Sequence, residues 1–224
     1  MDPKELMIEK YNALSKNIWV LPICKGLRDG GLSLIPFFGT AISSALDTRL
    51  AIIAEKNAQI FAEELKRRME HLDGNKIDKE FLESEEFVSL LIEILQKVNR
   101  VYEKEKISCL ASVFINSSLA DKSKTKFKEN FVRIISDLSM DHMAVFSAVY
   151  NKCDRTPPPQ DFLSAADIAQ QISLPIGRAI AYGFELTRYG IVADHGVGRF
   201  DYAPGNFTVT DYGKEFGAFL KNPS

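Results

Sequence analysis

Apolar residues recur every three or four positions from about residue 40 to residue 136, which is the spacing of amphipathic helices. The first row, with one polar member, predicts a helix of about 30 residues that starts after Thr40 and ends before Gly74. Its members are Leu46, Leu50, Ile53, Asn57, Phe61, Leu65, Met69 and Leu72.

Further rows with the same spacing predict more helices before residue 138. Ser84 followed by Glu85 and Glu86 is typical of a helix start, where a hydroxyl and acids meet unpaired amides and the positive end of the helix dipole. Because each predicted helix has one apolar face, the helices are expected to pack as a bundle. The rows are Phe87, Leu91, Ile94, Leu95, Val98 and Val101; Ile107, Leu110, Ala111 and Phe114; and Phe127, Phe131, Ile134, Ile135 and Leu138.

The pattern changes after Tyr150. Three consecutive prolines at 157–159 favour an extended connection, and Ser164 with Asp167 then forms a capping-box pattern at a helix start. After a short turn, Pro175 stands at the expected first position of a second helix, which Gly190 ends. A strand beginning at Ile191, a turn at 195–198, returning strand segments and a last helix opened by Asp211 are predicted to follow.

Three segments in this order resemble a winged helix-turn-helix domain over residues 138–221: LSMDHMAVFSAVYN, ADIAQQISLPIGRAIAYGFELTRYGIV and FTVTDYGKEFGAFL. The resemblance implies recognition of the DNA major groove by the second helix and phosphate contacts from a β-hairpin wing. It also implies that Ala179, Gly183 and Leu186 pack inward, the small pair allowing close approach to the preceding helix. The DNA or partner contacts that it implies are Arg178, Tyr182 and Arg188, on or near the outward face with Glu185, and Arg199 on the wing.

The predicted fold is therefore mainly α, with two domains. An N-terminal helical bundle is expected over residues 1–137. A C-terminal winged-helix domain with a small β-hairpin wing is expected over residues 138–224.

Charge complicates the DNA-binding interpretation. The whole chain of 224 residues has a formal net charge of −2. Residues 138–224 hold seven Lys and Arg against nine Asp and Glu, whereas the remaining residues balance at 21 of each. Because phosphate neutralisation supplies most non-specific DNA affinity, the acidic balance leaves open that the winged helix is instead a packing or protein-binding module.

No pattern of catalytic or ligand residues was found. Nucleotide-binding glycine loops, HExxH and GxSxG are absent, and His71, His142 and His195 have no ligand spacing. Cys24, Cys109 and Cys153 lack CxxC spacing and are expected to be buried in a reducing compartment. We therefore expect no catalytic, cofactor or metal residues, a protein that is not an enzyme, and a cytoplasmic location without a secretory signal.

An uncharged stretch with glycine and proline, GGLSLIPFFGTAISSAL, covers residues 30–46. It is too short for a spanning helix, so a buried loop is favoured over membrane or partner contact by Phe37 and Phe38. Over residues 30–150 the order of features resembles bacterial helical proteins of unknown function, some linked to phage defence, including the abortive-infection alpha type.

Two function hypotheses follow. The first is a non-enzymatic regulator or adaptor whose winged helix binds DNA and whose bundle serves homodimerisation or partner binding. The second is a helical effector or phage-defence protein that meets a membrane or a protein partner, with the winged helix as a protein-interaction module.

Overall fold

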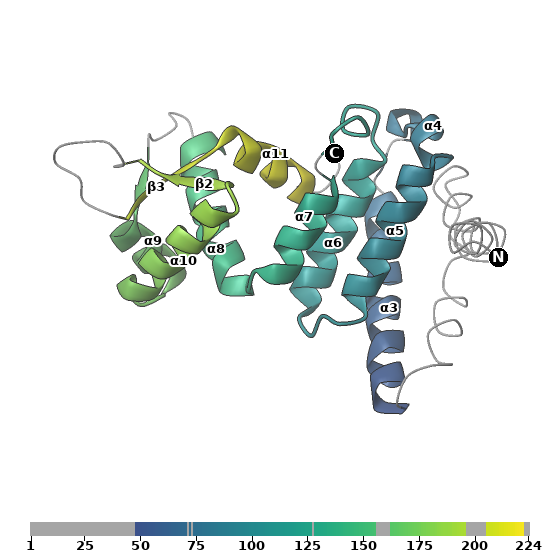
Figure 1. Ribbon diagram of the computed structural model, residues 1–224, viewed down its shortest axis with the longest axis horizontal. Helices are drawn as coiled ribbons and strands as arrows, with labels where there is room; N and C mark the ends of the chain where they lie inside the picture. Colours follow the sequence, from purple (N-terminus) through teal and green to yellow (C-terminus); the bar gives the residue numbers. More distant parts are fainter. Residues whose placement is uncertain are drawn as a thin grey trace, which may run out of the picture. The chain divides into compact units, whose positions relative to one another are not determined.

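The computed structural model describes residues 48–70, 72, 74–126, 128–155, 162–195 and 205–221. The chain divides between Val132 and Arg133 into two compact units, five residues before the boundary expected from the sequence (Figure 1). The prediction of a mainly helical protein is confirmed. The first unit contains α3 (Thr48–Met69), the 3₁₀ turn η2 (Gly74–Lys76), α4 (Lys79–Leu82), α5 (Glu85–Val98) and α6 (Lys104–Ser117), and α7 (Lys128–Asp137) continues into the second unit.

Helix α3 is built as its apolar row predicts over the described residues, Thr48–Met69, and the predicted start after Thr40 lies outside them. The described range has 22 residues, and Phe61 and Leu65 are buried. The polar member of the row, Asn57, is also buried because its side-chain amide donates hydrogen bonds to the carbonyl oxygens of Val98 (2.9 Å) and Val101 (2.6 Å). The Val98 carbonyl lies at the end of α5 and the Val101 carbonyl in the segment after it, so Asn57 joins α3 to the C-terminal end of α5 and to the segment that follows.

The core of the first unit lies between α3, α5 and α6, which run side by side (Figure 1). The ring of Phe114 on α6 lies 6.3 Å from that of Phe61 and 5.1 Å from that of Phe87, centroid to centroid. The predicted start of α5 is confirmed, since the Ser84 hydroxyl accepts a hydrogen bond from the amide of Phe87. Helix α4 was not predicted because it is only four residues long.

The second unit consists of helices around a small sheet (Figure 1). Its strands pair antiparallel in the order β1-β3-β2, with Leu163 opposite Phe207 and Val192 opposite Val209. The sequence missed β1, which has two residues. The elements are α8 (Met140–Tyr150), the π-helical turn η3 (Asn151–Arg155), β1 (Leu163–Ser164), α9 (Ala165–Ile172), α10 (Ile176–Arg188), β2 (Val192–Asp194), β3 (Asn206–Val209) and α11 (Asp211–Leu220).

Most of the predicted helix ends in this unit are confirmed. The Ser164 hydroxyl caps α9 and accepts from the amide of Asp167, and Gly190 follows α10 with a φ of +73°. Pro175 is the N-cap of α10 and not its first residue, so the prediction was wrong by one position. The α9–α10 turn contains Ser173 in the left-handed conformation, with a φ of 55°.

The inward face of α10 is confirmed as well, since Ala179, Gly183 and Leu186 are buried. The reason why position 183 requires a glycine differs from the expected one. A Cβ atom at position 183 would overlap the ring of Phe207 on β3, so the close neighbour of Gly183 is the sheet and not only a helix. Phe207 is fully buried and therefore has little room to move away.

Candidate functional site

The residues predicted to contact DNA or a partner fall into two groups on α10. Arg178 lies in the first turn and Arg188 is the last residue, and both are exposed. They are ten positions apart in the sequence, which is about 15 Å along the helix axis. Over the part of the chain that the structure describes, neither side chain forms a hydrogen bond or an ion pair.

Tyr182 and Glu185, between the two arginines, face α8. The ring centroid of Tyr182 lies 4.2 Å from that of His142, and Glu185 Oε2 lies 2.5 Å from His142 Nε2. The amide of Ser139 donates to His142 Nδ1 (3.2 Å), so Nε2 carries the hydrogen in the neutral ring and donates it to Glu185. His142 thus closes the capping box of α8 and also holds the middle of α10.

The first turn of α10 has few contacts with the rest of the described structure. Pro175 makes no side-chain cap, and the first turn contains no acidic residue. Ile176 is 53% exposed, and a Cβ atom at Gly177 would meet no atom within 4 Å. The amides of Arg178 and Ala179 donate to the carbonyl oxygen of Pro175, and within the described residues those of Ile176 and Gly177 remain free and give a partial positive charge close to Arg178.

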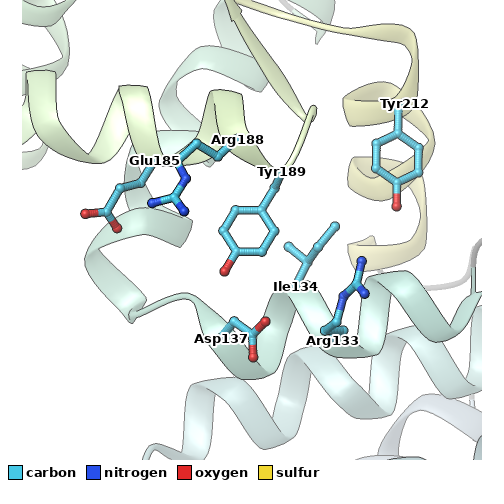
Figure 2. Close-up of a pocket in the computed structure, with 7 residues that line it drawn as sticks. All are labelled: Arg133, Ile134, Asp137, Glu185, Arg188, Tyr189 and Tyr212. Carbon is cyan, nitrogen blue, oxygen red and sulfur yellow. The ribbon is translucent and has the colours of Figure 1, made fainter.

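The C-terminal end of α10 borders a pocket of about 460 Å³ that lies within the second unit (Figure 2). Its residues come from the end of α7, from the end of α10 and the residue after it, and from the first turn of α11. They are Arg133, Ile134, Asp137, Glu185, Arg188, Tyr189 and Tyr212.

The charged groups of this pocket surround Tyr189 (Figure 2). The Tyr189 hydroxyl points toward Asp137, whereas the carboxylate of Glu185 points away toward its partner, His142. Partial burial raises the pKa of the Tyr189 phenol, and Asp137 raises it further, while Arg188 and Arg133 act in the opposite direction. The hydroxyl is therefore a neutral hydrogen-bond donor at physiological pH.

Sequence reasoning found only part of this pocket. It singled out Arg188 and Glu185 but not Arg133, Asp137, Tyr189 or Tyr212. Their contributions come from three separate elements, and no spacing in the sequence relates them.

Three predicted contact residues, Arg199, Phe37 and Phe38, lie outside the described residues, and their roles stay predictions. Among the helices that are described, none is long and apolar enough to span a bilayer. The described residues also contain no group of three or more His, Cys, Asp or Glu that would hold a metal ion. Comparisons with protein-family models, curated proteins and solved structures give no match to the chain.

Proposed function

We propose that the second unit is a winged helix-turn-helix domain that binds duplex DNA through α10, and that the protein is a non-enzymatic regulator or adaptor. The order α8, β1, α9, α10, β2, β3, α11 supports the winged-helix arrangement, with α9 and α10 as the helix-turn-helix. Strands β2 and β3 pair antiparallel, as the two sides of a wing do.

One observation carries the proposal: the first turn of α10 is exposed, uncapped and free of acids, and it bears Arg178 without an internal partner. In a helix-turn-helix, the N-terminal residues of the second helix contact base edges in the major groove. An exposed guanidinium suits the acceptor atoms of guanine, and the free amides suit a phosphate.

Charge sets the expected strength of binding. Residues 138–224 carry two more acids than bases, and Glu185 lies between the two arginines of α10. Few phosphates are therefore neutralised, so we expect weak non-specific binding with a shallow salt dependence. Discrimination among sequences would then depend on base contacts near Arg178 rather than on overall attraction.

The test is fluorescence anisotropy with fragmented genomic DNA at about 50 mM salt, where electrostatic binding is strong. We expect Arg178→Gln to weaken binding about tenfold, because a lost bidentate base contact costs about 1–3 kcal/mol. Lys79→Gln, which removes the same charge from an exposed position on α4, should have little effect. No binding by the wild-type protein at this salt concentration would refute the proposal.

A second candidate function is protein binding by the same helix, which the half-exposed Ile176 favours. Gly177 and Ala181 on the same helix are also exposed, and their small size would let another backbone approach closely. If the surface joins two copies of the chain, Ile176→Asp should shift a dimer to monomer in analytical ultracentrifugation, whereas Arg178→Gln should not. A wild-type chain that stays monomeric would exclude this self-association.

A further inference from the structure

The pocket beside Tyr189 contains charged side chains that do not pair with other described residues. Arg133, Asp137 and Arg188 are exposed, and within the described residues none of them forms an ion pair or a side-chain hydrogen bond. Glu185, the other acid of the pocket, is already bonded to His142. With the Glu185 carboxylate turned away from Tyr189 (Figure 2), the pocket around that ring holds two guanidinium groups and one carboxylate, Asp137, which favours an acidic ligand group there.

The size of the pocket argues for an organic ligand. Its volume of about 460 Å³ falls in the range of about 300–1,000 Å³ that is usual for small-molecule sites. An inorganic ion would leave most of this space to water. The ligand therefore has an organic part in addition to its acidic group.

The residues that line the pocket indicate which kind of organic group the ligand carries. Tyr189 and Tyr212 offer ring faces and hydroxyl groups, and the buried Ile134 adds an apolar contact (Figure 2). Aromatic faces suit a flat ring. The remaining carboxylate, Asp137, accepts hydrogen bonds from ligand hydroxyl or amino groups and repels a polyanion.

We propose that this pocket binds a small phosphate monoester that carries a ring with hydroxyl or amino groups. Such a phosphate has a charge of about −1.5 to −2 at pH 7, and the pocket has a guanidinium group on each side of Tyr189 to attract it, that of Arg188 and that of Arg133 (Figure 2). Arginine suits this group because its planar fork donates several hydrogen bonds to phosphate oxygens. A nucleotide and a sugar phosphate share this chemistry.

The proposal is independent of DNA binding. Arg178, which carries the DNA proposal, lies at the opposite end of α10 and is not part of the pocket. Substitutions at the two ends therefore report on the two proposals separately. Arg178→Gln should leave ligand binding unchanged, and Arg133→Gln should leave most of the DNA affinity unchanged.

Isothermal titration calorimetry of the full chain provides the test, with adenosine monophosphate, glucose 6-phosphate, adenosine and inorganic phosphate as separate ligands. We expect saturable binding of at least one of the two monoesters. Adenosine, which lacks the phosphate, and inorganic phosphate, which lacks the ring, should each bind at least tenfold more weakly than that monoester. Preference for adenosine monophosphate would indicate a nucleotide, and preference for glucose 6-phosphate a sugar phosphate.

Variants connect this binding to the pocket. Arg133→Gln and Arg188→Gln should each weaken monoester binding about tenfold, which is the usual cost of one charge-assisted hydrogen bond. Both side chains are exposed, so these variants should fold normally, as thermal unfolding would verify. Lys214→Gln, which removes an exposed charge from α11 outside the pocket lining, is the matched control.

Three results would overturn the proposal. The first is that neither monoester shows saturable binding at millimolar concentration. The second is that inorganic phosphate binds as tightly as the monoesters, which would mean an adventitious ion only. The third is that Arg133→Gln and Arg188→Gln bind as tightly as the Lys214→Gln control.

Discussion

The two units of the chain use their polar side chains differently. Among the described residues, the buried polar or charged side chains belong to the first unit with the single exception of His142. Lys128 is an example: its ammonium group contacts Glu86 Oε1 (2.7 Å) and the carbonyl oxygen of Ser123, and it lies 3.8 Å from the centre of the Phe81 ring. Such side chains stabilise the packing of the first unit.

In the second unit the charged side chains remain on the surface. Arg133, Arg178 and Arg188 are all exposed and make no ion pair over the part of the chain described by the structure. The contrast suggests a division of roles: buried charges of the first unit stabilise its fold, and these three arginines of the second unit are available for ligands. Substituting a polar residue should therefore affect stability in the first unit and binding in the second.

The largest expected change in the free energy of unfolding is at Asn57. Replacing it with leucine keeps its approximate size but leaves the carbonyls of Val98 and Val101 without their buried donor. We expect a loss of about 3 kcal/mol in the free energy of unfolding, measured by urea denaturation. Gln59→Leu, at an exposed site on the same helix, should change it by less than about 0.5 kcal/mol. Equal effects of the two variants would contradict the assignment of buried polar groups to stability.

A smaller effect is expected from glycines in the second unit. A Cβ atom at Gly213 would overlap the carbonyl oxygen of Ile191, and backbone cannot easily move aside. We expect Gly213→Ala to destabilise the protein by about 2 kcal/mol. In contrast, Gly177→Ala on the open face of α10 should be neutral or stabilising by up to about 0.5 kcal/mol. Thermal unfolding measures both, and a stability loss at Gly177 would show that this face is packed.

The smallest expected effect is the pH dependence of stability that the Cys109 thiol contributes. Burial raises the pKa of the Cys109 thiol on α6 from 9.0 to about 11, with the nearby Arg68 acting in the opposite direction. The thiol is thus protonated in the folded protein where the unfolded chain has lost its proton. Its contribution to stability is full below about pH 9 and is lost as the pH rises toward 11.

Site-resolved alkylation checks this pKa. At pH 8, iodoacetamide should modify Cys109 far more slowly in the folded protein than in urea, because the thiolate is the reactive form. The denatured chain is the control for intrinsic reactivity. Equally rapid modification in both states would mean that the fold does not shield the Cys109 thiol.

The sequence predicted the helices well where the signal is local. The apolar rows identified α3, α5 and α6, and Ser84, Ser164 and Gly190 marked helix ends because capping depends on neighbouring residues. It failed for β1 and α4, which are too short to show a period. These two elements depend on distant partners, since β1 pairs with β3, and Asp78, the cap of α4, accepts a hydrogen bond from Ser123.

The candidate site was less predictable for the same reason. Arg178 and Arg188 were identified because the helix-turn-helix pattern is continuous in sequence. The ring contact of Tyr182 with His142 and the pocket around Tyr189 join residues from separate helices, and no local pattern encodes those contacts. Tyr182 was expected to face outward, but its ring contacts His142 and is only partly exposed.

The central claim is that α10 uses Arg178 to bind DNA. The most direct measurement is the salt dependence of DNA affinity for wild type, Arg178→Gln and the Lys79→Gln control. We expect a shallow slope of log K against log salt in all three proteins and an affinity about tenfold lower only in Arg178→Gln, because a lost base contact weakens binding without changing phosphate neutralisation. Equal affinities of the three proteins, or a slope that changes only in Arg178→Gln, would contradict a base contact by Arg178.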